Sequence, residues 1–207
     1  MKESPYRLSF TSATLRVEET IAMARYIIDQ SQRKAVNHIP DDLFGNLKQS
    51  THARLVRELK ARLSNYSDEA MSLLVHGEFP DQKNMCYLGI LKTYPFIRHF
   101  VEKVLISNNE IFRTQVEEWQ YRDFFNAEEM NHSELRKMSE ESLKKIKRNM
   151  FTILREAEII SGKREIRITP IFPGSAEISV LSQEEQNWIP YYTLSYNWMK
   201  KPPNIQS

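Results

Sequence analysis

Residues 131–181 read NHSELRKMSEESLKKIKRNMFTILREAEIISGKREIRITPIFPGSAEISVL, and the order of helix and strand signals in them sets the fold we expect. Residues 132–137 predict a short helix. Ser139 is placed to cap a longer one, because a serine side chain accepts hydrogen bonds from the free N–H groups of a first helical turn. We expect the long helix to end at Ser161 and Gly162. Its apolar residues recur with the helical period at Leu143, Ile146, Met150, Ile153, Leu154, Ala157 and Ile160.

Two extended segments follow the long helix. Residues 165–171 and 176–181 predict strands, and the turn-forming residues between them (FPGS) predict a β-hairpin. A helix, a turn, a long basic helix and a hairpin is the order of a winged helix-turn-helix, whose second helix enters the major groove of DNA. The sequence therefore predicts a winged-helix-like unit over residues 127–207, including an aromatic C-terminal tail.

Lysine and arginine are concentrated in this predicted unit. Such residues hold DNA phosphates on either side of a helix that lies in the major groove. A surface helix also carries them opposite its apolar face without any partner. Both interpretations stay open from these residues alone. The cations at the start of the long helix are Lys144, Lys145, Lys147 and Arg148, and those at the hairpin are Lys163, Arg164 and Arg167.

Residues 1–126 predict a bundle of short-looped amphipathic helices, so the fold class is mainly α. One helix begins near Gln49 and buries an apolar stripe through Leu55, Leu59 and Leu63. Thr114 is placed to cap a later helix. The remaining surface of the helix that begins near Gln49 is basic, and we count as DNA-binding candidates Arg54, Arg57, Lys60 and Arg62.

Composition and motifs favour a protein without a catalytic site. The net charge of the 207 residues is only +2, so DNA binding has to depend on local clusters of cations. The sequence contains no HExxH, GxxxxGK[ST], GxGxxG or GxSxG motif, and one cysteine cannot build a CxxC metal site. The pairs His99 with Glu102 and His132 with Glu134 have no supporting third group. We predict no enzyme activity, no cofactor and no bound metal.

The sequence also predicts a cytoplasmic protein. Polar residues follow Met1, where a signal peptide would be apolar. The most apolar stretch, residues 84–97, is interrupted by Lys92 and Pro95 and is shorter than the about 20 residues that span a bilayer. A single cysteine, Cys86, suits a reducing compartment, and we expect it to be a small buried hydrophobe.

Three segments together resemble the BrxA family of bacterial BREX phage-defence systems. They are the early SFTSATLRVEETIAMARYI, the Arg-rich helix that starts with QST and ends with ARL, and the late LKKIKRNMFTILREAEIIS followed by strands. The resemblance implies a cytoplasmic, mostly helical DNA-binding protein with a NusB-like fold, acting beside methyltransferase and restriction components. Members were formerly labelled putative inner-membrane proteins, and this chain departs from that label because it has no spanning segment.

Two functions remain open from the sequence. The first is DNA binding with little sequence preference through the basic helices. The second is a protein-interaction scaffold of a defence complex with no direct role in nucleic-acid binding. The C-terminal aromatic residues could stack on unpaired bases, although docking of the segment on an apolar surface is the interpretation we favour. They are Trp188, Tyr191, Tyr192, Tyr196 and Trp198.

Overall fold

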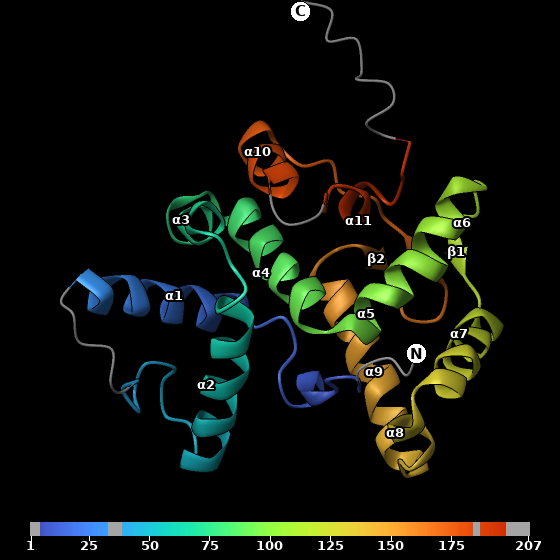
Figure 1. Ribbon diagram of the computed structural model, residues 1–207, viewed down its shortest axis with the longest axis horizontal. Coiled ribbons are helices and arrows are strands. Elements are labelled where there is room, and N and C mark those ends of the chain that lie inside the picture. Colours follow the sequence, from blue (N-terminus) through green and yellow to red (C-terminus); the bar gives the residue numbers. More distant parts are fainter. Residues whose placement is uncertain (1–4, 33–38, 184–186, 198–207) are drawn as a thin grey trace, which may run out of the picture.

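The computed structural model describes residues 5–32, 39–183 and 187–197. Helices make up most of these residues, and a small antiparallel sheet of three strands lies beside them (Figure 1). The expected mainly helical fold class is confirmed.

The first half of the chain is helical, as expected. Ser67 caps α3, since its Oγ accepts the amide of Ala70 at 3.2 Å. Helix α4 lies near the middle of the molecule and is buried around most of its circumference (Figure 1). Cys86 on α4 is 1% exposed, which confirms it as a buried hydrophobe. The elements are η1 (Ser9–Ser12), α1 (Val17–Gln32), α2 (Gln49–Leu63), α3 (Asp68–His76) and α4 (Phe79–Thr93).

A long helical segment follows, made of α5 (Pro95–Phe100), the π-helical η2 (Val101–Ile106) and α6 (Ser107–Glu110). It ends where Phe112 adopts a left-handed conformation with φ of 60°. The amide of Arg113 then donates to the carbonyl of Asn108 at 2.9 Å and closes the last turn. The phenyl ring of Phe112 is 91% exposed.

The second half of the chain holds the sheet. Its elements are β1 (Gln115–Val116), α7 (Glu118–Asn131), α8 (Ser133–Arg136), α9 (Glu140–Glu156), β2 (Ile160–Ser161), β3 (Ile166–Ile168), α10 (Ser175–Gln183) and α11 (Pro190–Thr193). The strand order is β1-β3-β2 and both pairs are antiparallel. Strand β1 lies between the long helical segment and α7, so it precedes the position where we placed the domain boundary. That boundary, after residue 126, and the NusB-like description of the bundle stay predictions.

The hairpin differs from the one we predicted. Residues 176–181 are helical and belong to α10, not to a second strand. The carboxylate of Glu177 accepts the amide of Gly174 at 2.7 Å and so satisfies a free N–H at the start of the helix. Within these residues, Glu177, Val180 and Leu181 are buried, and their spacing is that of one face of a helix. Strand β3 pairs instead with β2, which lies between the long helix and β3 in the sequence.

Two helix boundaries also differ from the sequence prediction. Helix α9 ends at Glu156 rather than at Ser161, because Glu158 turns the chain with a φ of 62° and Ile159 bonds back to Leu154 at 3.0 Å. Helix α7 begins at Glu118, not after Thr114, because Glu117 and Gln120 form a capping box. The residues between Thr114 and that capping box join the sheet as β1.

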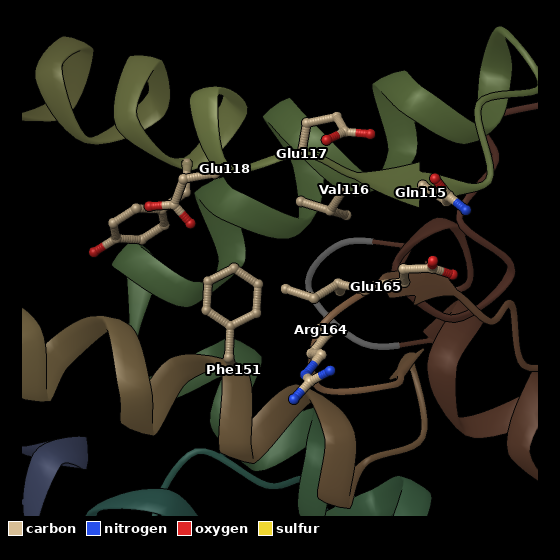
Figure 2. Close-up of a pocket in the computed structure, with 9 residues that line it drawn as sticks. Gln115, Val116, Glu117, Glu118, Phe151, Arg164 and Glu165 are labelled. Atoms are coloured by element: carbon tan, nitrogen blue, oxygen red, sulfur yellow. The ribbon is translucent and has the colours of Figure 1, made fainter.

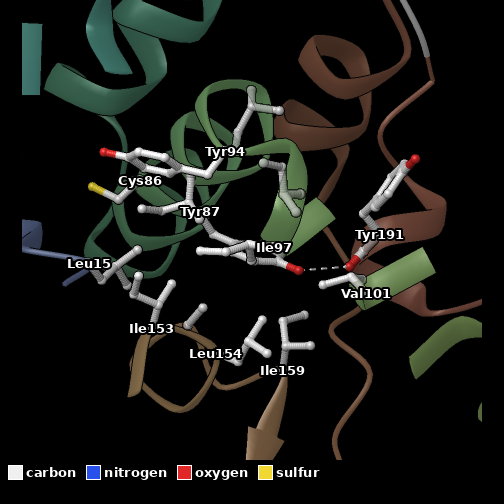
Figure 3. Close-up of a cluster of buried hydrophobic side chains, with 14 of the residues drawn as sticks. Leu15, Cys86, Tyr87, Tyr94, Ile97, Val101, Ile153, Leu154, Ile159 and Tyr191 are labelled. Carbon is white, nitrogen blue, oxygen red and sulfur yellow. Dashed lines mark hydrogen bonds between the residues drawn. The ribbon is translucent and has the colours of Figure 1, made fainter. Parts of the chain in front are cut away.

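One core joins the two halves of the chain. Figure 3 shows Ile153 and Leu154 of α9, with Ile159, facing Tyr87 and Ile97 of the central helices. The C-terminal segment docks on this core, since the side chains of Trp188, Tyr191 and Tyr192 are buried and only Tyr196 is exposed. This confirms docking for those three rings, and Trp198 lies outside the described residues.

Candidate nucleic-acid interface

The long helix α9 is fixed by its cap and by its buried face. Ser139 Oγ accepts the amide of Ser142 at 3.3 Å, as the sequence predicts. Ile146, Met150 and Ile153 are completely buried, so the opposite face of the helix is turned to solvent. Lys144, Lys145 and Arg148 are exposed on that face, which is where the sequence placed them.

Two of the α9 lysines already have acidic neighbours. Lys144 Nζ lies 3.8 Å from Glu140, and both side chains are exposed. Lys147 is only 31% exposed, pairs with Glu118 of α7, and places its Nζ 4.8 Å from the centre of the Tyr121 ring. Exposed ion pairs contribute about 0–1 kcal/mol and exchange readily. The α9 cations therefore remain available to an anion, Lys147 less than the others.

The hairpin between β2 and β3 presents the second group of cations. Gly162 has a φ of 80°, and a Cβ atom there would lie 2.0 Å from the Glu165 carbonyl, so the tight turn requires glycine. Lys163 and Arg164 are exposed beyond it. Arg167 is exposed on β3 and lies 3.3 Å from Glu165.

A small cavity of about 190 Å³ lies under this hairpin, against β1, the start of α7 and the middle of α9. Figure 2 shows Phe151 on one side of it and Arg164 at its edge. Three carboxylates, those of Glu117, Glu118 and Glu165, also line it. An excess of carboxylates makes this cavity unsuitable for a phosphate, so anion contacts belong to the outer face of the hairpin.

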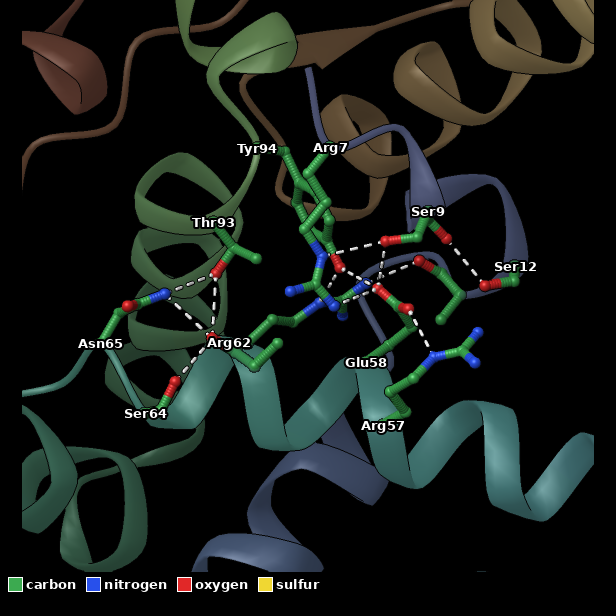
Figure 4. Close-up of polar contacts among 12 residues, drawn as sticks. Arg7, Ser9, Ser12, Arg57, Glu58, Arg62, Ser64, Asn65, Thr93 and Tyr94 are labelled. Carbon is green, nitrogen blue, oxygen red and sulfur yellow. Dashed lines mark hydrogen bonds and ion pairs between the residues drawn. The ribbon is translucent and has the colours of Figure 1, made fainter. Parts of the chain in front are cut away.

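Helix α2 divides our four candidates into three exposed residues and one buried residue. Arg54, Arg57 and Lys60 are exposed. Arg62 is 1% exposed and cannot contact DNA, so that prediction is wrong. Its guanidinium donates to the carbonyls of residues 13, 14 and 15 at 2.6, 2.8 and 3.1 Å, and to the Tyr94 hydroxyl at 3.1 Å (Figure 4). Helical geometry places Arg62 on the same face as the buried Leu55 and Leu59.

Glu58 completes this buried polar cluster one turn earlier on α2. Its Oε2 accepts hydrogen bonds from Ser9 Oγ at 2.7 Å, Tyr94 at 2.9 Å and Arg7 at 3.2 Å (Figure 4). Burial raises the pKa of the Glu58 carboxyl, but these hydrogen bonds and the positive charge of Arg7 outweigh burial and hold the pKa below its usual value. The carboxylate is therefore ionised at neutral pH and holds the N-terminal segment on α2.

The N-terminal segment lies between α2 and α9 and contacts both. Asn149 of α9 donates to the Thr11 carbonyl at 2.8 Å, and Glu156 accepts the Leu15 amide at 2.8 Å. Figure 1 shows η1 between the two basic helices. The sequence alone predicts no role for this segment. The signal that could have revealed it was Glu58 and Arg62 on the apolar face of α2.

A second buried polar cluster holds Tyr6 to α7 and α8. The Tyr6 hydroxyl donates to Glu128, and Lys103 Nζ lies 2.6 Å from the same carboxylate. Burial raises the pKa of Glu128, but hydrogen bonds from His99, Lys103 and Tyr6 outweigh burial and bring the pKa to about 2. His132 stacks on the Tyr6 ring with centroids 3.7 Å apart.

The two histidine pairs considered in the sequence differ in their surroundings. His132 Nδ1 does lie 3.2 Å from Glu134, but the histidine side chain is 2% exposed. His99 lies 3.7 Å from Glu128 instead of pairing with Glu102. Both histidines thus belong to the cluster that holds Tyr6. Among the described residues, no group of three or more His, Cys, Asp and Glu side chains is placed to hold a metal ion.

Comparison with known proteins supports the fold and assigns the family. The structure resembles the crystal structure of an uncharacterized protein from Magnetospirillum magneticum, with a TM-score of 0.72. The resemblance covers 92% of this chain and 98% of that one at 12% identity, so it shows a shared fold. No curated protein matches the chain. Within the described ranges, none of the helices has the length and apolar character needed to cross a membrane.

The family assignment comes from a sequence model. The BrxA family model matches residues 4–185, which is nearly the whole chain and includes both basic helices and the hairpin. The protein therefore belongs to the BrxA family.

Proposed function

We propose that this protein is a non-enzymatic DNA-binding component of a bacterial BREX phage-defence system. Membership of the BrxA family implies the BREX system. In this proposal the protein acts in the cytoplasm on duplex DNA, with little sequence preference, beside methyltransferase and restriction components. The DNA contacts are made by α9, by the β2–β3 hairpin and by the exposed part of α2.

The order of elements around α9 supports a winged helix-turn-helix. The long helix of residues 95–110 is followed by β1, α7, α8 and α9, β2 and β3, and β1 lies beside β3. Winged helix-turn-helix units have this order of elements and this strand order. In such units the second helix of the motif enters the major groove. Here that helix is α9, and the β2–β3 hairpin is the wing. The unit in this proposal begins near residue 95, so it includes β1.

The observation that carries the proposal is the exposed basic face of α9. Lys144, Lys145 and Arg148 are turned to solvent on the first half of a capped helix, opposite completely buried residues. The wing adds exposed Lys163 and Arg164. Long cations on both elements can displace counterions from phosphates, which supplies sequence-independent affinity.

The same face of α9 carries little that could read bases. Asparagine is a residue that recognises adenine, but the Asn149 side-chain amide donates to the Thr11 carbonyl and is held against η1. Glu140 and Glu141, in the first turn, carry negative charges that repel phosphate. The surface therefore suits phosphate contacts more than base contacts, in keeping with little sequence preference.

An exposed apolar patch favours the scaffold as second candidate. Phe112 and Trp119 are 91% and 46% exposed and line one shallow pocket beside β1, and Ile111, next to Phe112 in the chain, is 63% exposed. Exposed apolar patches mark protein interaction sites. Under this alternative the BREX role is assembly, and the basic faces of α2 and α9 are solvated.

Gel-shift titration at several salt concentrations tests the proposal. Replacing Lys144, Lys145 and Arg148 with Gln should weaken binding to every duplex sequence. The slope of log affinity against log salt should flatten by up to about 2.7, since each phosphate contact contributes about 0.9. A second variant, in which Arg54, Arg57 and Lys60 are replaced with Gln, measures the contribution of α2 to DNA affinity and to the salt slope.

A matched control replaces exposed Arg25 on α1 with Gln, which should change neither affinity nor slope. If the α9 variant binds with the affinity and salt slope of the wild type, α9 is a solvated helix and the scaffold function is favoured.

A further inference from the structure

A groove between α7 and α9 has an apolar floor and a cationic rim. Glu118, Tyr121, Arg122 and Phe125 line one side and occur at helical spacing, so they form one stripe of α7. The α9 side is lined by Leu143, Lys144 and Lys147. Helices α7 and α9, whose side chains form the groove, lie at the lower right of Figure 1.

The floor of the groove consists of apolar side chains that the fold leaves partly exposed. Phe125 and Leu143 are half-buried. The Phe125 ring stacks on Tyr121 with centroids 6.2 Å apart. The Tyr121 ring in turn packs against the Phe151 ring of α9, with centroids 5.8 Å apart, so the floor is anchored to the core. A rigid apolar floor of this kind gains free energy when a partner removes it from water.

The rim is mostly cationic. Arg122, Lys144 and Lys147 line the groove, against the single carboxylate of Glu118. Asp123 and Glu140 lie 4.0 and 3.8 Å from Arg122 and Lys144, outside the groove, and all four of these side chains are exposed. Long ion pairs between exposed groups are weak, so an incoming carboxylate can replace them. The rim therefore complements an anionic partner.

The size of the groove restricts what can fill it. Its volume of about 260 Å³ lies just below the about 300–1,000 Å³ of sites for small-molecule ligands. It can accept one or two apolar side chains. Duplex DNA is a poor fit, because its convex surface of phosphates and polar base edges cannot cover a concave apolar floor.

We propose that this groove is a docking site for an acidic segment of a partner protein. One bulky apolar side chain of the segment, of the size of leucine or phenylalanine, lies on Phe125 and Leu143. Flanking aspartates or glutamates pair with Arg122 and Lys144, and Lys147, which pairs with Glu118, lies between them and the floor. This proposal does not depend on DNA binding, although Lys144 belongs to both surfaces, so partner and duplex compete.

The test uses a fluorescein-labelled peptide, Asp-Glu-Glu-Leu-Phe-Glu-Asp, and fluorescence anisotropy with the full-length protein. The wild type should bind it. A peptide with Ser-Ser in place of Leu-Phe, or with Gln and Asn in place of the acids, should bind at least about tenfold more weakly. Equal binding of the Ser-Ser peptide would show attraction by charge alone and overturn the proposal, as would no binding of the parent peptide.

Protein variants separate this site from the DNA surface. Phe125→Ser and Leu143→Asn remove the floor without changing charge, and should each weaken peptide binding about tenfold while leaving duplex affinity unchanged. Thermal melts show whether either variant is unfolded. If one is, the folded variant alone tests whether the apolar floor binds the peptide. Peptide binding that survives both changes, or duplex binding that falls with it in a folded variant, would refute a separate docking groove.

Discussion

The guanidinium Nε of Arg62 donates a hydrogen bond of 3.1 Å to the hydroxyl of Tyr94, and both side chains are completely buried. The same hydroxyl donates to Glu58 at 2.9 Å. The guanidinium also serves three carbonyls of the N-terminal segment. An arginine that the sequence offers as a DNA contact is therefore the link between α2, the residue that joins α4 to α5, and the N-terminal segment.

Replacing Arg62 with Met should cost about 3–5 kcal/mol of unfolding free energy, because it leaves three carbonyls of the N-terminal segment and the Tyr94 hydroxyl without their donor. Arg54 provides the control on the same helix, since its side chain is exposed. Arg54→Met should change stability by less than about 0.5 kcal/mol. Urea denaturation measures both. Equal losses in the two variants would contradict the burial of Arg62.

Glu128 should make stability depend on pH in the acid range. Its pKa is about 2 in the folded protein against 4.5 for an ordinary glutamate. Because the folded-state pKa is lowered, the stabilisation is complete above about pH 4.5 and is lost as pH falls towards about 2. The free energy of unfolding lost over this range is on the order of 3 kcal/mol. Glu128→Gln should be less stable at neutral pH and should flatten this dependence, whereas exposed Glu141→Gln should not. Denaturant midpoints across the acid range supply the measurement, and parallel curves for wild type and Glu128→Gln would exclude this role.

The wing should contribute to DNA binding independently of α9. Changing Lys163 and Arg164 to Gln should lower affinity for all duplex sequences and flatten the salt slope by up to about 1.8, at about 0.9 for each phosphate. Neither side chain supports the core, so the melting temperature should stay the same. Fluorescence anisotropy with duplexes of different sequence gives affinity and slope, and an effect limited to one sequence would indicate base reading instead.

Phe112 should be a site where glycine stabilises the protein. Its φ of 60° is costly for a bulky residue, and its ring is 91% exposed, so little packing is lost on its removal. Phe112→Gly should raise the unfolding free energy by about 1 kcal/mol. Its neighbour Ile111 is also exposed but has a φ of −104°, so Ile111→Gly should not stabilise. A Phe112→Gly protein that melts below the wild type would contradict this account.

Much of the fold can be predicted because local signals and tertiary structure agree. Ser139 caps a helix where the sequence places it, and the apolar stripe of α9 is buried as its period predicts. Disagreement arises where short segments carry weak signals. Residues 176–181 alternate enough to suggest a strand, yet a buried carboxylate, Glu177, caps them as a helix. Strand β1 has two residues and no periodicity to detect.

The sequence by itself determined the helical class, the Ser139 cap, the long basic helix and the family resemblance, because these depend on spacing and chemistry within short stretches. Tertiary structure alone decided which cations face solvent. Arg57 and Arg62 lie on the same helix, and the Arg57 side chain is 69% exposed. Helical geometry turns Arg62 to the buried side, where its guanidinium donates to carbonyls of a segment distant in sequence. Tertiary structure also brought η1 between α2 and α9 and made β1 a neighbour of β3, since contacts between segments far apart in the chain leave no local pattern.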